Sequence, residues 1–221
     1  MLFSFALRVV GFPSLLAVLI APKAVLAMDP SDLCLRAAAS ASEASGVPYD
    51  VLLAIAVVET ARDEKPWPWT VNLGGEGHWL HSAKEAEAIV AQALEDGLTN
   101  VDLGCFQLNY RWHAEAFVSI ADMLDPERNA AYAAGFLAQH YARTGDWAAA
   151  AAAYHSTTPD YAARYRARFE TAWAGADSID RPAPVDASRT NGFPLLVAGK
   201  TGSRGSLVPA TTAGQRLIGS P

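Results

Sequence analysis

The stretch VLLAIAVVET (residues 51–60) places eight uncharged apolar residues directly before a single carboxylate, Glu59. Pro48 stands at a position typical of a first helical turn, so we expect a helix that enters the core and ends near Glu59. A carboxyl at the edge of an apolar helix has its charged form disfavoured, which raises its pKa and suits a general acid. From this helix alone, an ion pair between Glu59 and Arg62 is the simpler explanation.

Residues 1–27 have the features of a secretory signal peptide. A weakly positive start is followed by an apolar stretch over residues 9–20, and residues 25–27 have the small-x-small form of a cleavage site. The alternative is an uncleaved membrane anchor, but the stretch is short for that and contains Pro13 and Pro22. We therefore expect export to the periplasm, with no membrane span after cleavage.

Charge and cysteine content narrow the function classes. The formal net charge is −6, and the chain shows no basic face, so nucleic acid is not an expected partner. Cys34 and Cys105 are the two cysteines. In an oxidising compartment they can form one disulfide, although two free buried thiols remain the alternative.

Capping residues, prolines and glycines divide the rest of the chain into helices and one hairpin. We expect an α+β fold class that is mainly α-helical. Residues 67–80 have the composition of a short β-hairpin, and residues 176–221 read as a disordered tail because hydrophobic periodicity is lost there. The expected helices cover residues 31–45, 48–59, 82–97, 125–145, 146–156 and 158–173.

Four segments resemble, in order, the motifs of the soluble (SLT) type of lytic transglycosylase. GCFQLN (104–109) resembles the family pattern G-L-M-Q-I/V-N, and VVET (57–60) resembles its Glu-Ser at the end of the second helix. DPERNAAYAAGFLAQHY (125–141) and AAAYHS (151–156) resemble its D-P-x-x-N helix and its A-Y-N-A-G segment. The resemblance implies a goose-type-lysozyme-like domain over residues 28–175, with the hairpin inserted after the catalytic helix.

The same resemblance implies an enzyme that acts on peptidoglycan. Glu59 would be the only acid/base and would cleave the β-1,4 bond between N-acetylmuramic acid and N-acetylglucosamine, with a 1,6-anhydro product. The likeness is greatest to small exported enzymes that serve secretion, conjugation or flagellar assembly, so such an apparatus is a candidate partner. Two alternatives remain open: a hydrolytic muramidase, and a peptidoglycan-binding assembly factor without catalysis.

The resemblance also implies a set of substrate-binding residues. Gln107 would bind substrate amides, unless it bonds the local backbone instead. Tyr154 would bond or orient Glu59, unless it only packs in the core. Thr60 and Asn109 are weaker candidates at matching positions.

Trp67 and Trp69 could stack on sugar rings, and packing within the hairpin is the equal alternative. We expect no cofactor and no metal, because the histidines match no known ligand spacing. Some positions depart from the family pattern, namely Thr60, Cys105-Phe106 and His155-Ser156, and these departures bear on substrate contacts rather than on the acid.

Overall fold

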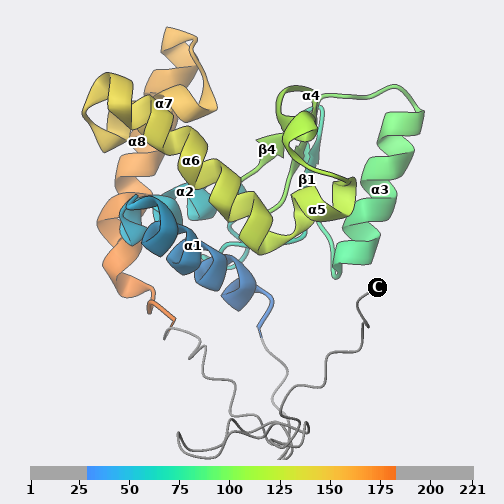
Figure 1. Ribbon diagram of the computed structural model, residues 1–221, viewed down its shortest axis with the longest axis horizontal. Helices are drawn as coiled ribbons and strands as arrows, with labels where there is room; N and C mark the ends of the chain where they lie inside the picture. Colours follow the sequence, from blue (N-terminus) through green and yellow to red (C-terminus); the bar gives the residue numbers. More distant parts are fainter. Residues whose placement is uncertain (1–28, 183–221) are drawn as a thin grey trace, which may run out of the picture. The chain divides into compact units, whose positions relative to one another are not determined.

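The computed structural model describes residues 29–182, which form mainly helices with one small sheet (Figure 1). The signal peptide expected over residues 1–27 lies outside this range. The helices are α1 (Ser31–Ser45), α2 (Tyr49–Thr60), α3 (Ala83–Glu95), α4 (Tyr110–His113), α5 (Ile120–Leu124), α6 (Pro126–Thr144), α7 (Trp147–His155) and α8 (Pro159–Gly175), with 3-10 turns η1 (Ala114–Ala116) and η2 (Ala176–Ser178). The strands are β1 (Thr70–Leu73), β2 (Glu76–Trp79), β3 (Val101–Leu103) and β4 (Leu108–Asn109). The α+β, mainly helical, lysozyme-like fold class is confirmed.

Local capping explains where the helices start and stop. The side chains of Ser82, Asp125 and Asp146 each accept a hydrogen bond from the backbone N–H three residues on, which satisfies a free donor of the first turn. Gly46 and Gly145 end α1 and α6 in the left-handed conformation, with φ of 76° and 66°. These are boundaries that the sequence predicts.

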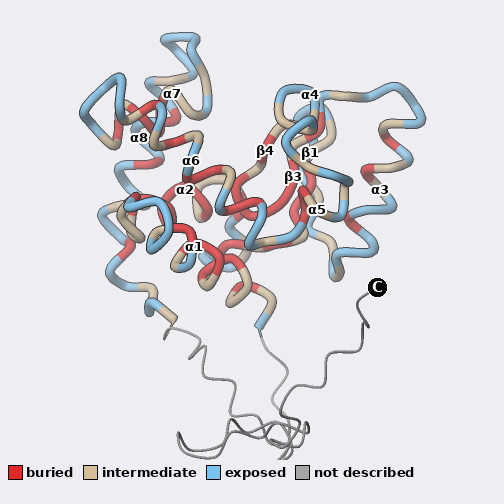
Figure 2. The backbone as a smooth tube through the Cα atoms, viewed as in Figure 1, coloured by how far each residue is buried: buried red, intermediate tan, exposed pale blue. Residues whose placement is uncertain are grey.

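Helix α2 occupies the middle of the helical part of the fold. Residues 51–56 are all buried, and the tube through them is red in Figure 2. Helix α1 packs on α6, α6 on α7, and α7 on α8, which returns to cover α2. Alanines supply many of the contacting positions, such as Ala134 and Ala151, and their small side chains let the helix axes approach closely. The start of the apolar segment is therefore core, as expected.

The predicted hairpin is present but belongs to a larger sheet. Strand order is β2-β1-β3-β4, all antiparallel, so β3 and β4 were missed by the sequence analysis. Val71 pairs with Leu103, which pairs with Leu108, and all three are buried. Because side chains alternate along a strand, the neighbouring residues of these strands point to the opposite face. That face borders the site described below.

Two further differences from the sequence analysis have a physical cause. Residues 110–124 form α4, η1 and α5, elements too short to show helical periodicity. The tail expected from residue 176 starts too early, because Ala176 is buried against Leu35 and Leu53 and η2 continues the fold. Residues 183–221 lie outside the described range.

The disulfide between Cys34 and Cys105 joins α1 to the segment between β3 and β4. Both cysteines are fully buried, and their Cα atoms are 5.7 Å apart across 71 residues of sequence. A crosslink of this span lowers the conformational entropy of the unfolded chain. In the chain-entropy description, this stabilises the folded state by about 4 kcal/mol.

The double variant Cys34→Ala/Cys105→Ala should lose about 2–4 kcal/mol of unfolding free energy, measured by chemical denaturation. Reductant should lower the stability of the wild type to a similar degree and leave the double variant unchanged. Equal stability of the two proteins under oxidising conditions would contradict the assigned bond.

Candidate active site

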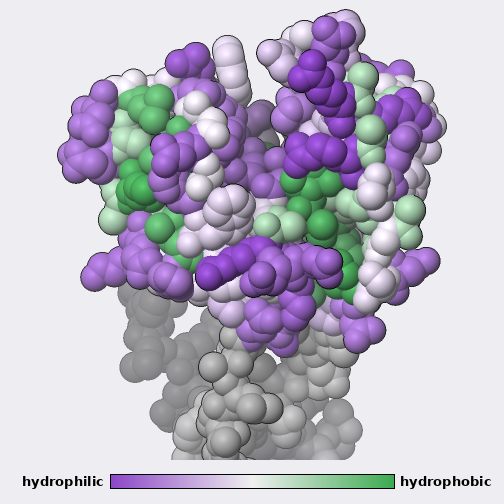
Figure 3. All heavy atoms as spheres, turned by 180° about the vertical axis from the view of Figure 1, so that it is seen from behind, coloured by the Kyte–Doolittle hydropathy of each residue, from purple (hydrophilic) through white to green (hydrophobic). Residues whose placement is uncertain are grey.

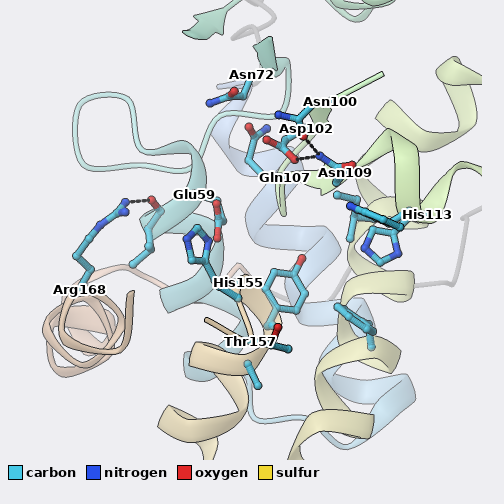
Figure 4. Close-up of a pocket in the computed structure, with 17 residues that line it drawn as sticks. Glu59, Asn72, Asn100, Asp102, Gln107, Asn109, His113, His155, Thr157 and Arg168 are labelled. Carbon is cyan, nitrogen blue, oxygen red and sulfur yellow. Dashed lines mark hydrogen bonds between the residues drawn. The ribbon is translucent and has the colours of Figure 1, made fainter. Parts of the chain in front are cut away.

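An open cleft lies between the helical part of the fold and the sheet. Its volume is about 670 Å³, a size that suits a few sugar rings. Figure 3 shows the molecule hollowed between these two parts, and Figure 4 shows the residues that line the cleft. The lining comes from the end of α2, the sheet, and helices α4, α6, α7 and α8, and it includes Glu59, Gln107, Asn109 and Tyr154.

Glu59 occupies the last turn of α2 and reaches the cleft while remaining largely surrounded by protein. Burial is the main cause that raises the pKa of its carboxyl to about 7, against an ordinary value of 4.5. The ion pair with Arg62 is not formed, because the Arg62 guanidinium lies over the Trp67 ring, 4.6 Å from its centroid. Glu59 can therefore hold a proton near neutral pH, as a general acid requires.

Two side chains of α8 flank the Glu59 carboxyl. The Tyr165 hydroxyl is fully buried, makes no regular hydrogen bond with a described group, and lies near enough to lower the pKa of Glu59. Arg168 also lowers that pKa through its charge, and it is anchored by a 2.7 Å hydrogen bond to the Val58 carbonyl. Both groups act against the effect of burial, and both would stabilise the carboxylate once the proton has left.

The sheet supplies a polar wall opposite α2 and α8. Asn72, Asp102 and Asn109 pair in register across β1, β3 and β4, and all three line the cleft. The Asp102 carboxylate accepts a 2.8 Å hydrogen bond from the Asn109 side chain. Burial raises the pKa of Asp102, and the charge of Asp102 in turn raises that of Glu59. Figure 4 shows Asp102 and Asn109 together on this wall, joined by the dashed bond.

Gln107 lies in the short connection between β3 and β4 with φ of 45°, a left-handed conformation rare for a residue with a side chain. Its side-chain N–H₂ donates to the carbonyls of Thr70 and Gly104, at 3.0 Å each. Both donors are used within the protein, so the amide oxygen is the atom that remains for a ligand. Gln107 thus bonds local backbone and also lines the cleft, and its binding of substrate amides stays a prediction.

The side chain of Asn129, on α6, holds the same connection between β3 and β4 in place. Its side chain accepts from the Phe106 N–H and donates to the carbonyls of Leu103 and Met123, all within 3.0 Å and fully buried. Gly104 packs directly against it, and a Cβ at Gly104 would lie 2.8 Å from the Asn129 amide. The cleft floor is therefore held in place by buried hydrogen bonds.

Tyr154 lines the cleft, but its hydroxyl donates to the Phe106 carbonyl at 2.7 Å. This bond ties α7 to the cleft floor. The tyrosine nearest to the Glu59 carboxyl is Tyr165, which the sequence analysis did not single out. Its spacing of four residues from Phe169 on α8 marks it as a core position, and nothing in that pattern indicates a polar role.

Three other predicted residues lie outside the cleft lining. Thr60 is buried, and its hydroxyl donates to the Ala56 carbonyl and accepts from the Trp67 N–H. Trp67 donates to the Leu80 carbonyl and packs edge-on against Trp69. This is the packing within the hairpin region that the sequence left open, and sugar stacking by these two rings stays a prediction.

An exposed aromatic residue that the sequence analysis did not name borders the cleft. Trp112 of α4 is 74% exposed and belongs to the lining. Within residues 29–182 no cluster of histidine, cysteine and carboxylate side chains is arranged to hold a metal ion. The same residues contain no helix long and apolar enough to cross a membrane.

The raised pKa of Glu59 predicts a pH-dependent cost to stability. Unfolded, the carboxyl titrates near 4.3, so the folded chain retains the extra proton between that pH and about 7. The stabilisation by neutral Glu59 is complete below pH 4.3 and is lost as pH rises through 7. Wild type should therefore lose about 1–3 kcal/mol relative to Glu59→Gln between pH 4 and pH 8, measured by chemical denaturation.

Glu87→Gln, which changes an exposed carboxyl on α3, is the matched control and should show no such divergence. Parallel stability curves for wild type and Glu59→Gln would contradict the burial of a neutral carboxyl.

Comparison with known proteins agrees with this geometry. The family model of the transglycosylase SLT domain matches residues 36–170, which is more than half of the chain and includes the whole cleft lining. A search of curated proteins and a search of solved structures each give no match. The comparisons do not support a secretion, conjugation or flagellar partner, so that expectation stays a prediction. The family match implies a lytic-transglycosylase type of action on peptidoglycan, and the chain belongs to the transglycosylase SLT domain family.

Proposed function

We propose that this protein is a periplasmic lytic transglycosylase in which Glu59 is the single acid/base. It would cleave the β-1,4 bond between N-acetylmuramic acid and N-acetylglucosamine and leave a 1,6-anhydro end. The observation that carries the proposal is a carboxyl with a pKa of about 7 that opens into a cleft large enough for sugar rings.

In the first step, protonated Glu59 gives its proton to the glycosidic oxygen, and the bond from that oxygen to C1 breaks. The substrate's own N-acetyl group supports the positive charge that develops at C1. Arg168 and the unpaired Tyr165 hydroxyl lie where they stabilise the new Glu59 carboxylate. The Gln107 amide oxygen is free to accept from an N-acetyl N–H of the substrate, because both of its N–H groups are already bonded.

In the second step, the Glu59 carboxylate removes the proton of the C6 hydroxyl, and that oxygen bonds to C1. The carboxyl is thereby returned to its neutral form, and no water is consumed. This cycle requires a group that holds a proton before the reaction and accepts one after it, so a pKa close to the working pH is favourable for both steps.

One observation favours a second candidate, hydrolysis. Asp102 is a second carboxyl in the same cleft, and its charge acts on Glu59. Glycosidases that use water commonly employ two carboxyls, one as acid and one to activate water or support C1. The Asp102 carboxyl already accepts a 2.8 Å hydrogen bond from the Asn109 side chain, and the family model that matches is that of a transglycosylase domain, so we place hydrolysis second.

Digestion of purified sacculi with product analysis by mass spectrometry tests the proposal. Wild type should release mainly 1,6-anhydro muropeptides, and Glu59→Gln should release them about 10²–10⁴-fold more slowly, because general acid/base catalysis contributes that much. Glu87→Gln should keep the wild-type rate.

Products with reducing ends would favour hydrolysis over the proposal. A folded Glu59→Gln protein that degrades sacculi at the wild-type rate would refute the role of Glu59. Failure of wild type to degrade sacculi would favour a non-catalytic wall-binding protein.

A further inference from the structure

A second groove shares Glu59 with the cleft. It is lined by the end of α2, by small side chains of α8 such as Ala167 and Thr171, and by the Trp79 ring of the hairpin. Val58, Glu59 and Arg168 belong to both the cleft and this groove. Glu59 therefore lines two neighbouring depressions, and the second has a volume of about 840 Å³.

Trp79 is a large apolar side chain that the fold leaves in solvent. It is 43% exposed, and its indole N–H donates to the Thr60 carbonyl at 3.0 Å, next to Glu59 in the sequence. One edge of the ring lies against Gly77, where a Cβ would approach the ring carbons to 3.1 Å. The indole is thus held in one orientation beside the groove, and little ordering would be required when a ligand binds.

We infer that this groove binds the saccharide on the other side of the scissile bond, with a sugar ring stacked on Trp79. The inference rests on the proposed function, since a bond cleaved at Glu59 has sugars on both sides and the strand must leave the cleft. Because Val58, Glu59 and Arg168 line both depressions, a strand that passes Glu59 would continue along α8. An exposed, fixed aromatic ring beside that path provides the flat apolar surface that the C–H face of a pyranose ring covers.

Arg168 adds a polar contact at the junction. Its single hydrogen bond among the described residues is the one to the Val58 carbonyl, so the remaining guanidinium N–H groups are available to substrate oxygens. The inserted hairpin thereby has a role in substrate binding, through Trp79 rather than through Trp67 or Trp69.

The test uses the full chain carrying Glu59→Gln, so that no turnover occurs, and a hexamer of β-1,4-linked N-acetylglucosamine as the probe. Indole N–H signals are recorded by ¹⁵N NMR, and Trp79→Phe assigns the Trp79 signal by its loss. Addition of the hexamer should shift that signal. Trp79→Ala should weaken hexamer binding about 3–10-fold, whereas Trp79→Phe, which keeps an aromatic ring, should stay within about twofold.

Trp147→Phe is the matched control, because Trp147 stacks on Tyr141 outside both grooves. The indole signal of Trp147 should not move when the hexamer is added, and Trp147→Phe should not change the affinity for the hexamer. A Trp79 signal that stays fixed in the presence of the hexamer overturns the inference, whether or not the hexamer binds elsewhere. If the Trp79 signal stays fixed but wild type cleaves sacculi, the proposed function holds and only the role of this groove is refuted. If the Trp79 signal shifts but wild type cleaves no sacculi, the groove binds saccharide and the proposed function is refuted.

Discussion

The structure depends on one constraint: the Glu59 carboxyl is kept at the end of an apolar helix, where its charged form is disfavoured. Burial is the largest cause and raises the pKa of Glu59, the Tyr165 hydroxyl and the Arg168 charge lower it, and the net value is about 7. The balance matters because an acid that never ionises cannot act as a base in the next step. Helix α8, which packs along α2, provides both opposing groups.

The cleft forms where the sheet meets the helices. The connection from Leu103 to Gln107, between β3 and β4, links the two. It is held by the Asn129 hydrogen bonds, by the Tyr154 hydroxyl and by the Cys34–Cys105 disulfide. These contacts come from α6, α7 and α1 respectively. A strained backbone at Gln107 is tolerated because its surroundings fix it so completely.

Much of this could be predicted from the sequence because the signals are local. Proline, glycine and capping residues set the helix boundaries, and the apolar run before Glu59 marks both the central helix and the raised pKa of its carboxyl. The four ordered motifs indicate the family and bring Gln107 and Asn109 into view. Their placement in the cleft follows from the fold.

The remainder depends on tertiary contacts that no local pattern encodes. Tyr154 and Tyr165 are both tyrosines on helical core faces, and only the packing of α8 on α2 shows which of them lies next to Glu59. Asp102 reaches the cleft because strand register sets it opposite Asn72 and Asn109. Strands β3 and β4 have three and two residues, too few for alternation to be visible.

The central claim is that Glu59 retains its proton up to about neutral pH in the resting protein. The most direct measurement is the pKa of its side-chain carboxyl, followed by ¹³C NMR in protein labelled at glutamate and assigned with Glu59→Gln. The account predicts a midpoint near 7. A midpoint at or below about 4.5, the range of an ordinary glutamate, would contradict it.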